Sequence, residues 1–157
     1  MGINLSDMIE ACAFDEYDVD IATSGLCGTF ALALKSVFPQ VGLAVICDND
    51  EQGKPDRASD GDLAWRHVVA VFEGELFDVE GMVQLEHLVD NYCWRNPHGT
   101  GGSLVLQSLA EIEELLQDGG KSYDAGRLEE WSATMKRAMA AIEQGCCARK
   151  VPSPGMT

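Results

Sequence analysis

The chain has 157 residues, of which 11 are basic and 26 acidic, giving a formal net charge of −15. This length suits one domain, and an apolar fraction of 46% is sufficient for a hydrophobic core. The negative charge opposes binding to nucleic-acid phosphates and anionic lipids, so we expect neither a nucleic-acid nor a membrane partner. No apolar run approaches the roughly 18 residues of a membrane span, and no secretory signal is visible. We therefore expect a cytoplasmic protein with mostly free thiols.

The first 38 residues predict two helices separated by irregular chain. Apolar residues recur at helical spacing over 5–13, with Ser6 as the expected N-cap. Residues 14–22 are acidic and are expected to be irregular. A flexible turn over 24–28 then leads into an Ala- and Leu-rich helix over 29–38.

The middle of the chain carries the β signals. A short apolar run over 43–47 predicts a buried strand, and the polar residues 48–62 predict an exposed loop. Residues 67–72 and 75–79 predict two strands joined by a turn at Glu73-Gly74.

The remaining sequence predicts alternating helices, a loop and one more strand, followed by a long helix. In chain order these are a helix over 82–91, a loop over 93–102, a strand over 104–106, a helix over 109–117 capped by Ser108 and Glu111, and a helix over 124–144.

Together these elements predict an α+β fold, because consecutive hairpin strands form antiparallel sheets. We expect N-terminal helices packed on a small antiparallel sheet, with further helices at the C-terminus. The single domain is expected to span 1–145, and 146–157 to form a flexible tail.

Cys27 is the first candidate for chemistry because it stands at the predicted start of a buried helix. The unpaired N–H groups and the dipole of a helix N-terminus stabilise a thiolate, the nucleophilic form of cysteine. Gly25 and Gly28 bracket it and would allow a substrate to approach closely. The alternative is that Cys27 is a small core residue.

His67 and Asp78 lie on the two strands of the predicted hairpin. A two-residue turn pairs Val69 with Asp78, which places Asp78 on the His67 face as a diagonal neighbour at roughly 7–8 Å. The carboxylate can then orient the imidazole and stabilise its charged form. In the same register Glu80 stands opposite His67, so it is the alternative orienting group.

These segments resemble the papain-like and transglutaminase-like superfamily, especially its small bacterial and phage members. The resemblance covers residues 22–82 and is carried by Gly25–Leu34, Trp65–Val71 and Gly74–Gly81. It implies a Cys27 nucleophile at the start of a helix packed on an antiparallel sheet, with His67 and Asp78 on neighbouring strands.

One feature of papain-type enzymes is missing, namely the Gln that precedes the cysteine as an oxyanion donor. The Ser24 hydroxyl, the backbone N–H of Cys27 or a side chain that the sequence does not identify would have to take its place. Trp65 is a further candidate for lining the cleft, although it is at least as well suited to packing under the sheet.

We therefore expect a cysteine-dependent hydrolase, such as a protease, isopeptidase or amidase, acting through a thioester intermediate. The same site would serve a transglutaminase, a deamidase or an acyltransferase. A third hypothesis is a catalytically silent, acidic binding or inhibitor protein. The expected partner is a protein or peptide substrate, and the net charge favours one with a basic surface. The sequence does not define the oligomeric state.

Metal binding is a weaker alternative. Cys93 and His98 stand five residues apart and could join Cys47 or His87, but the chain has no Cys-x-x-Cys pair. The acidic residues of 15–20 lack the spacing of a calcium loop. We expect no metal and no cofactor.

Overall fold

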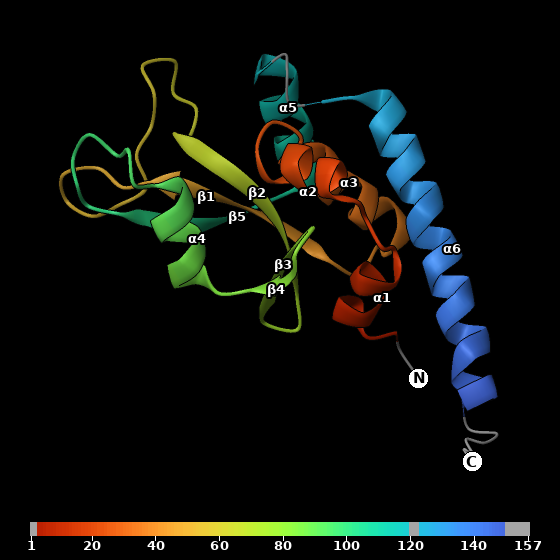
Figure 1. Ribbon diagram of the computed structural model, residues 1–157. Helices are drawn as coiled ribbons and strands as arrows, with labels where there is room; N and C mark the ends of the chain where they lie inside the picture. The colour runs from red at the N-terminus through yellow and green to blue at the C-terminus, as the bar shows by residue number, and fades with distance from the viewer. Residues whose placement is uncertain (1–2, 120–122, 150–157) are drawn as a thin grey trace.

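A computed structural model describes residues 3–119 and 123–149 (Figure 1). Its helices are α1 (Leu5–Ala11), α2 (Glu16–Thr23), α3 (Cys27–Val37), α4 (Leu85–Tyr92), α5 (Leu109–Gly119) and α6 (Ala125–Arg149). Its strands are β1 (Gly42–Asp48), β2 (Trp65–Phe72), β3 (Glu75–Asp78), β4 (Gly81–Val83) and β5 (Gly102–Gln107). The fold is α+β, as the sequence predicts.

The five strands form one sheet in the order β4-β3-β2-β1-β5, and every neighbouring pair is antiparallel. The β2–β3 hairpin turns at Glu73 and Gly74, with φ angles of 51° and 79°. Two consecutive residues with positive φ are typical of a type I′ turn, whose twist matches that of the flanking strands. The resulting register pairs Phe72 with Glu75 and Ala70 with Phe77, as expected for a two-residue turn.

Helices cover both faces of the sheet, because side chains alternate between the faces along each strand. On one face Val45 and Val68 pack with residues of α3 and α5. On the other face Ile46 and Val69 pack against Leu88 of α4. Cys27, at the start of α3, and Tyr92, at the end of α4, therefore come from helices on different sides of the sheet.

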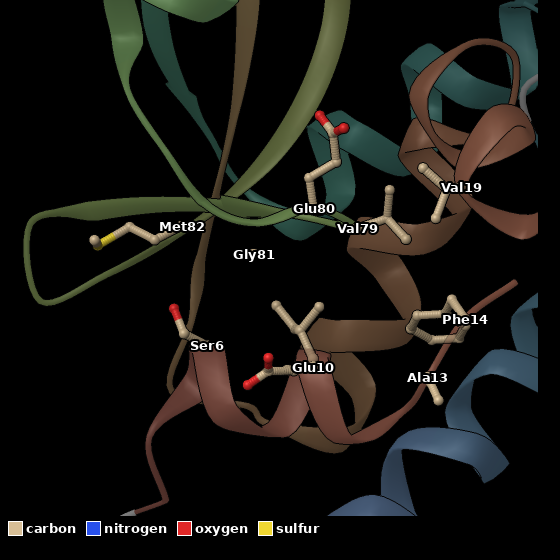
Figure 2. Close-up of a pocket in the computed structure, with 10 residues that line it drawn as sticks. Ser6, Glu10, Ala13, Phe14, Val19, Val79, Glu80, Gly81 and Met82 are labelled. Carbon is tan, nitrogen blue, oxygen red and sulfur yellow. The ribbon is translucent and has the colours of Figure 1, made fainter. Parts of the chain in front are cut away.

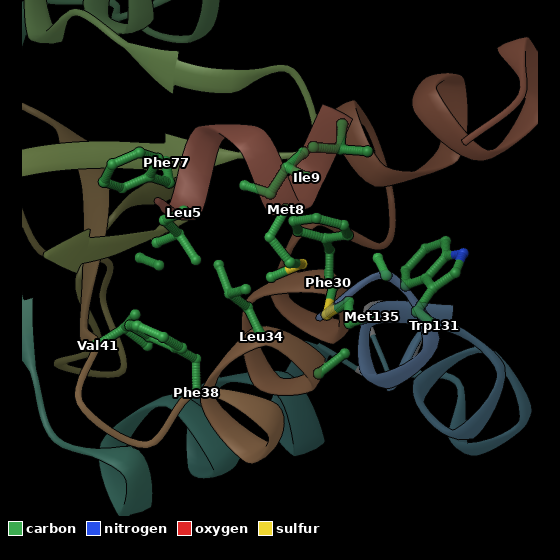
Figure 3. Packing of buried hydrophobic residues seen from close by; sticks show 14 of the residues in the cluster. Leu5, Met8, Ile9, Phe30, Leu34, Phe38, Val41, Phe77, Trp131 and Met135 are labelled. Carbon is green, nitrogen blue, oxygen red and sulfur yellow. The ribbon is translucent and has the colours of Figure 1, made fainter. Parts of the chain in front are cut away.

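A second core joins α1, α3 and α6 at one end of the sheet (Figure 3). Met8, Phe30 and Trp131 are all fully buried within it. The rings of Phe30 and Trp131 meet edge to face, with centroids 5.7 Å apart. This packing fixes α3, the helix that begins at Cys27, between the sheet and the long α6.

Two predictions in the N-terminal region are wrong. The N-cap of α1 is Asn4, whose side chain accepts a hydrogen bond from the N–H of Asp7 at 3.1 Å, so Ser6 lies inside the helix. Residues expected to be irregular form α2, because Asp15 caps it through the N–H of Asp18 at 2.8 Å. Acidic side chains in the first turn also stabilise this helix, because they interact favourably with the positive end of its dipole.

The C-terminal half agrees more closely with the sequence. Ser108 and Glu111 form the predicted capping box, with bonds of 3.1 and 2.8 Å. The short strand β4 was not predicted. Helix α6 continues to Arg149, past the expected boundary at 145, and residues 150–157 of the expected tail lie outside the described residues. Within the described part of the chain, no helix has the length and apolarity needed to cross a membrane.

Candidate active site

Cys27 is the first residue of α3. The preceding residue, Leu26, provides no capping side chain, and its backbone N–H donates a hydrogen bond to the carbonyl of Ile21 at 2.7 Å. The thiol therefore stands at the uncapped, positive end of the helix dipole, a position that favours a negative charge. The residue is only 3% exposed, so its surroundings exclude most water.

The first turn of α3 is held by elements from the C-terminal third of the chain. A Cβ on Gly28 would overlap the side chain of Leu116 in α5, so only glycine allows this close approach. The backbone N–H of Asp124, just before α6, donates to Oγ1 of Thr29 at 3.1 Å. The position of Cys27 is thus fixed by packing on both sides.

His67 and Asp78 form a buried pair. Nε2 of His67 lies 3.0 Å from Oδ2 of Asp78, and the two residues are 0% and 3% exposed. Oδ1 of Asp78 accepts the backbone N–H of Glu80 at 2.8 Å, which fixes the carboxylate. Asp78, rather than Glu80, is therefore the carboxylate that contacts the imidazole.

The imidazole is biased toward its charged form. Burial lowers the pKa of His67, but the hydrogen bond to Asp78 and the nearby Cys27 thiol outweigh it and raise the pKa from 6.5 to about 9. The other ring nitrogen, Nδ1, is enclosed and has no hydrogen bond of good geometry to any described residue. Cys27 therefore influences the ring by proximity, and Nδ1 remains available to exchange a proton.

Tyr92, the last residue of α4, covers the imidazole. The two rings are stacked, with centroids 4.0 Å apart and planes 7° from parallel. The Tyr92 hydroxyl donates to the carbonyl of Thr23 at 2.8 Å. Burial, Asp78 and Cys27 all raise the pKa of Tyr92, which keeps this hydroxyl protonated as a donor. Sequence analysis did not single out Tyr92, because no local pattern indicates that α4 ends beside β2.

The other predicted cleft residues are placed differently. The Ser24 hydroxyl donates to the carbonyl of Asp20 at 2.7 Å, so it is already engaged at the end of α2. Gly25 faces open space, which leaves room for a ligand, whereas Gly28 faces Leu116. Trp65 is partly buried and packs on the cluster that contains Cys27, as the structural interpretation of this residue predicts.

A groove of about 340 Å³ lies beside the buried pair. Its lining includes Thr23 and Ser24, from the chain leading to Cys27. Tyr92 and Arg66, which adjoin His67 in space and in sequence, also line it. The groove is thus lined by neighbours of Cys27 and His67, and not by Cys27, His67 or Asp78 themselves.

A larger pocket, of about 450 Å³, lies between α1 and the segment that joins β3 to β4 (Figure 2). Ser6 and Glu10 of α1 face Glu80, Gly81 and Met82 across it. Cys27, His67 and Asp78 do not line this pocket. Its volume alone does not make it the reaction site.

The residues considered for metal binding are dispersed. His98 lies near Glu51 and Asp56, with nitrogen–oxygen distances of 3.8 and 3.6 Å. Cys93 is buried beside Asp48. Among residues 3–119 and 123–149, no three His, Cys, Asp or Glu side chains are grouped as metal ligands.

The fold and site define an α+β protein with a buried Cys27, His67 and Asp78 at the junction of helix α3 and the β2–β3 hairpin. A comparison with protein families matches residues 5–133 to the family described as phage YunG-like protein. The chain belongs to this family, whose description names no activity. Searches of the curated proteins and of the solved structures found no significant match.

Proposed function

We propose that the protein is a cysteine-dependent hydrolase of amide or isopeptide bonds, with Cys27 as nucleophile, His67 as base and acid, and Asp78 as orienting group. The carrying observation is the buried Nε2–Oδ2 contact of 3.0 Å on an imidazole that lies beside a thiol. The position of that thiol at a helix N-terminus adds support. The resemblance of residues 22–82 to papain-like and transglutaminase-like enzymes is consistent with these roles.

The proposed reaction begins from a thiolate–imidazolium pair, in which His67 already holds the proton of Cys27. The thiolate attacks the substrate carbonyl, and Asp78 stabilises the imidazolium. As the C–N bond breaks, His67 gives its proton to the leaving amine, and a thioester remains on Cys27. His67 then takes a proton from water, whose oxygen attacks the thioester. The C–S bond breaks, the acid is released, and His67 keeps the proton taken from water beside the Cys27 thiolate, which restores the resting site.

Acyl transfer is the second candidate. Cys27 and His67 are 3% and 0% exposed, so little bulk water reaches the sulfur that would carry the thioester. A bound amine in place of water would give a transglutaminase or acyltransferase. Adding an amine such as glycine ethyl ester to the assay distinguishes these outcomes by the product that forms.

The first test is the alkylation rate of each cysteine in the native protein, measured by peptide mapping at pH 6.5 with glutathione as reference thiol. Burial raises the pKa of Cys12 to about 11, that of Cys93 to about 12, and also that of Cys47. These three thiols should therefore react slowly. We expect Cys27 to react faster than glutathione, because a neighbouring imidazolium favours the thiolate.

His67→Ala should remove this advantage of Cys27, whereas His87→Gln, at an exposed histidine, should preserve it. A substrate-derived thioester on Cys27, detected by mass spectrometry after acid quench, would then establish covalent catalysis. If Cys27 instead reacts no faster than the buried cysteines, the hydrolase proposal is wrong. A silent, acidic binding protein would be the better interpretation.

A further inference from the structure

The charge of the groove beside His67 is opposite to that of the chain as a whole. The residues that line it are Thr23, Ser24, Arg66, Asn91, Tyr92, Trp94 and Arg95. They include two guanidinium groups and no carboxylate, in a chain with 26 acidic residues and only 11 basic ones. A local positive patch on such a background attracts anionic groups.

The two arginines are held differently. Nε and Nη2 of Arg66 donate to Oδ2 of Asp48 at 3.1 and 2.6 Å, which fixes the plane of the guanidinium group. The Arg66 side chain is nevertheless 34% exposed. Arg95 lies over the ring of Trp94, at 4.5 Å from the centroid, and makes no ion pair within the described part of the chain. Arg95 therefore supplies the uncompensated positive charge.

Trp94 and Asn91 complete a surface suited to a peptide. The Trp94 side chain is 68% exposed, so its ring offers a flat apolar face beside the charge. The Asn91 amide can donate to and accept from a peptide backbone. Guanidinium groups bind carboxylates through paired, charge-assisted hydrogen bonds.

We propose that this groove selects substrates that carry a carboxylate next to the bond attacked by Cys27. This inference rests on the proposed function for the position of the bond, but not for the binding itself. The carboxylate can belong to an internal acidic side chain or to a free chain terminus. The negative net charge alone would favour a basic partner. The positive charge of the groove instead predicts an acidic group on the substrate.

The test measures peptide binding to Cys27→Ala by calorimetry, which requires no catalysis. One pair of probes is N-acetylated Ala-Gly-Glu-Ala-Gly amide and its Gln counterpart. The other pair is N-acetylated Ala-Gly-Ala-Gly as the free acid and as the amide. We expect one carboxylate peptide to bind about tenfold more tightly than its neutral partner, and the pair that responds identifies the source of the carboxylate.

Arg95→Gln in the same background should reduce this preference to less than about twofold. Lys136→Gln is the matched control, because it removes the same charge at an exposed position on α6 and should leave the preference intact. Equal affinities within both pairs, no detectable binding of either acid at millimolar concentration, or an equal effect of the two substitutions would overturn the inference. If Cys27 is reactive but peptide binding shows no preference for a carboxylate, only the proposal about the groove is wrong. If binding shows that preference but Cys27 is inert, only the hydrolase proposal is wrong.

Discussion

The buried His67–Asp78 pair makes a quantitative prediction about pH and stability. The pKa of His67 is about 9 in the folded protein and about 6.5 for an unfolded histidine. Because the folded value is the higher one, the stabilisation is fully present below pH 6.5 and is lost as the pH rises through 9. The difference corresponds to about 3 kcal/mol, of which roughly 2 to 3 kcal/mol should disappear between pH 6 and pH 9.

The variant Asp78→Asn isolates this contribution. Asn keeps an oxygen for the N–H of Glu80, but its amide group donates to Nε2 of His67 and leaves the ring neutral. Burial then lowers the pKa of His67, and little pH-dependent stabilisation remains above pH 6.5. The other titrating groups are common to both proteins and cancel in the comparison.

Urea unfolding at pH 6 and pH 9, followed by circular dichroism, measures the effect. Wild type should lose about 2 to 3 kcal/mol more than Asp78→Asn over this interval. The NMR titration of the His67 ring should show a midpoint near 9 in wild type, and His87→Gln identifies one of the other two histidine signals. Equal losses in the two proteins would refute the assignment of a charged imidazole.

Two further substitutions test the packing around the site, with urea unfolding as the measurement. Gly28→Ala should cost about 1 to 2 kcal/mol, because the new methyl group meets Leu116, while Gly25→Ala faces open space and should change stability by less than about 0.5 kcal/mol. Trp131→Ala should cost about 3 to 5 kcal/mol, because the indole is fully buried, and Trp94→Ala at an exposed indole should cost far less. Equal costs within either pair would contradict the packing described.

The sequence predicted the hairpin well because its determinants are local. Glu73 and Gly74 set the turn, and the turn sets the register that places Asp78 on the His67 face. Helix α2 was not predicted because its N-cap, Asp15, is one of several acidic residues in the same run. Nothing in the sequence distinguishes it from its neighbours as the start of a helix.

The surroundings of the site could not be predicted in the same way. Tyr92 reaches His67 because α4 packs across one face of the sheet, and Leu116 reaches Gly28 because α5 packs on the other. Contacts between residues so distant in sequence follow from tertiary packing, which leaves no periodic signal in either segment.

The contacts around the first turn of α3 also determine when the site can assemble. The N-terminal 37 residues contain Cys27 and all of α3, but Gly28 packs against Leu116, and Oγ1 of Thr29 accepts from the N–H of Asp124. A ribosome adds about 5 to 20 residues per second, so Cys27 emerges several seconds before the segment that positions it. During synthesis the thiol is therefore made early and becomes ordered late.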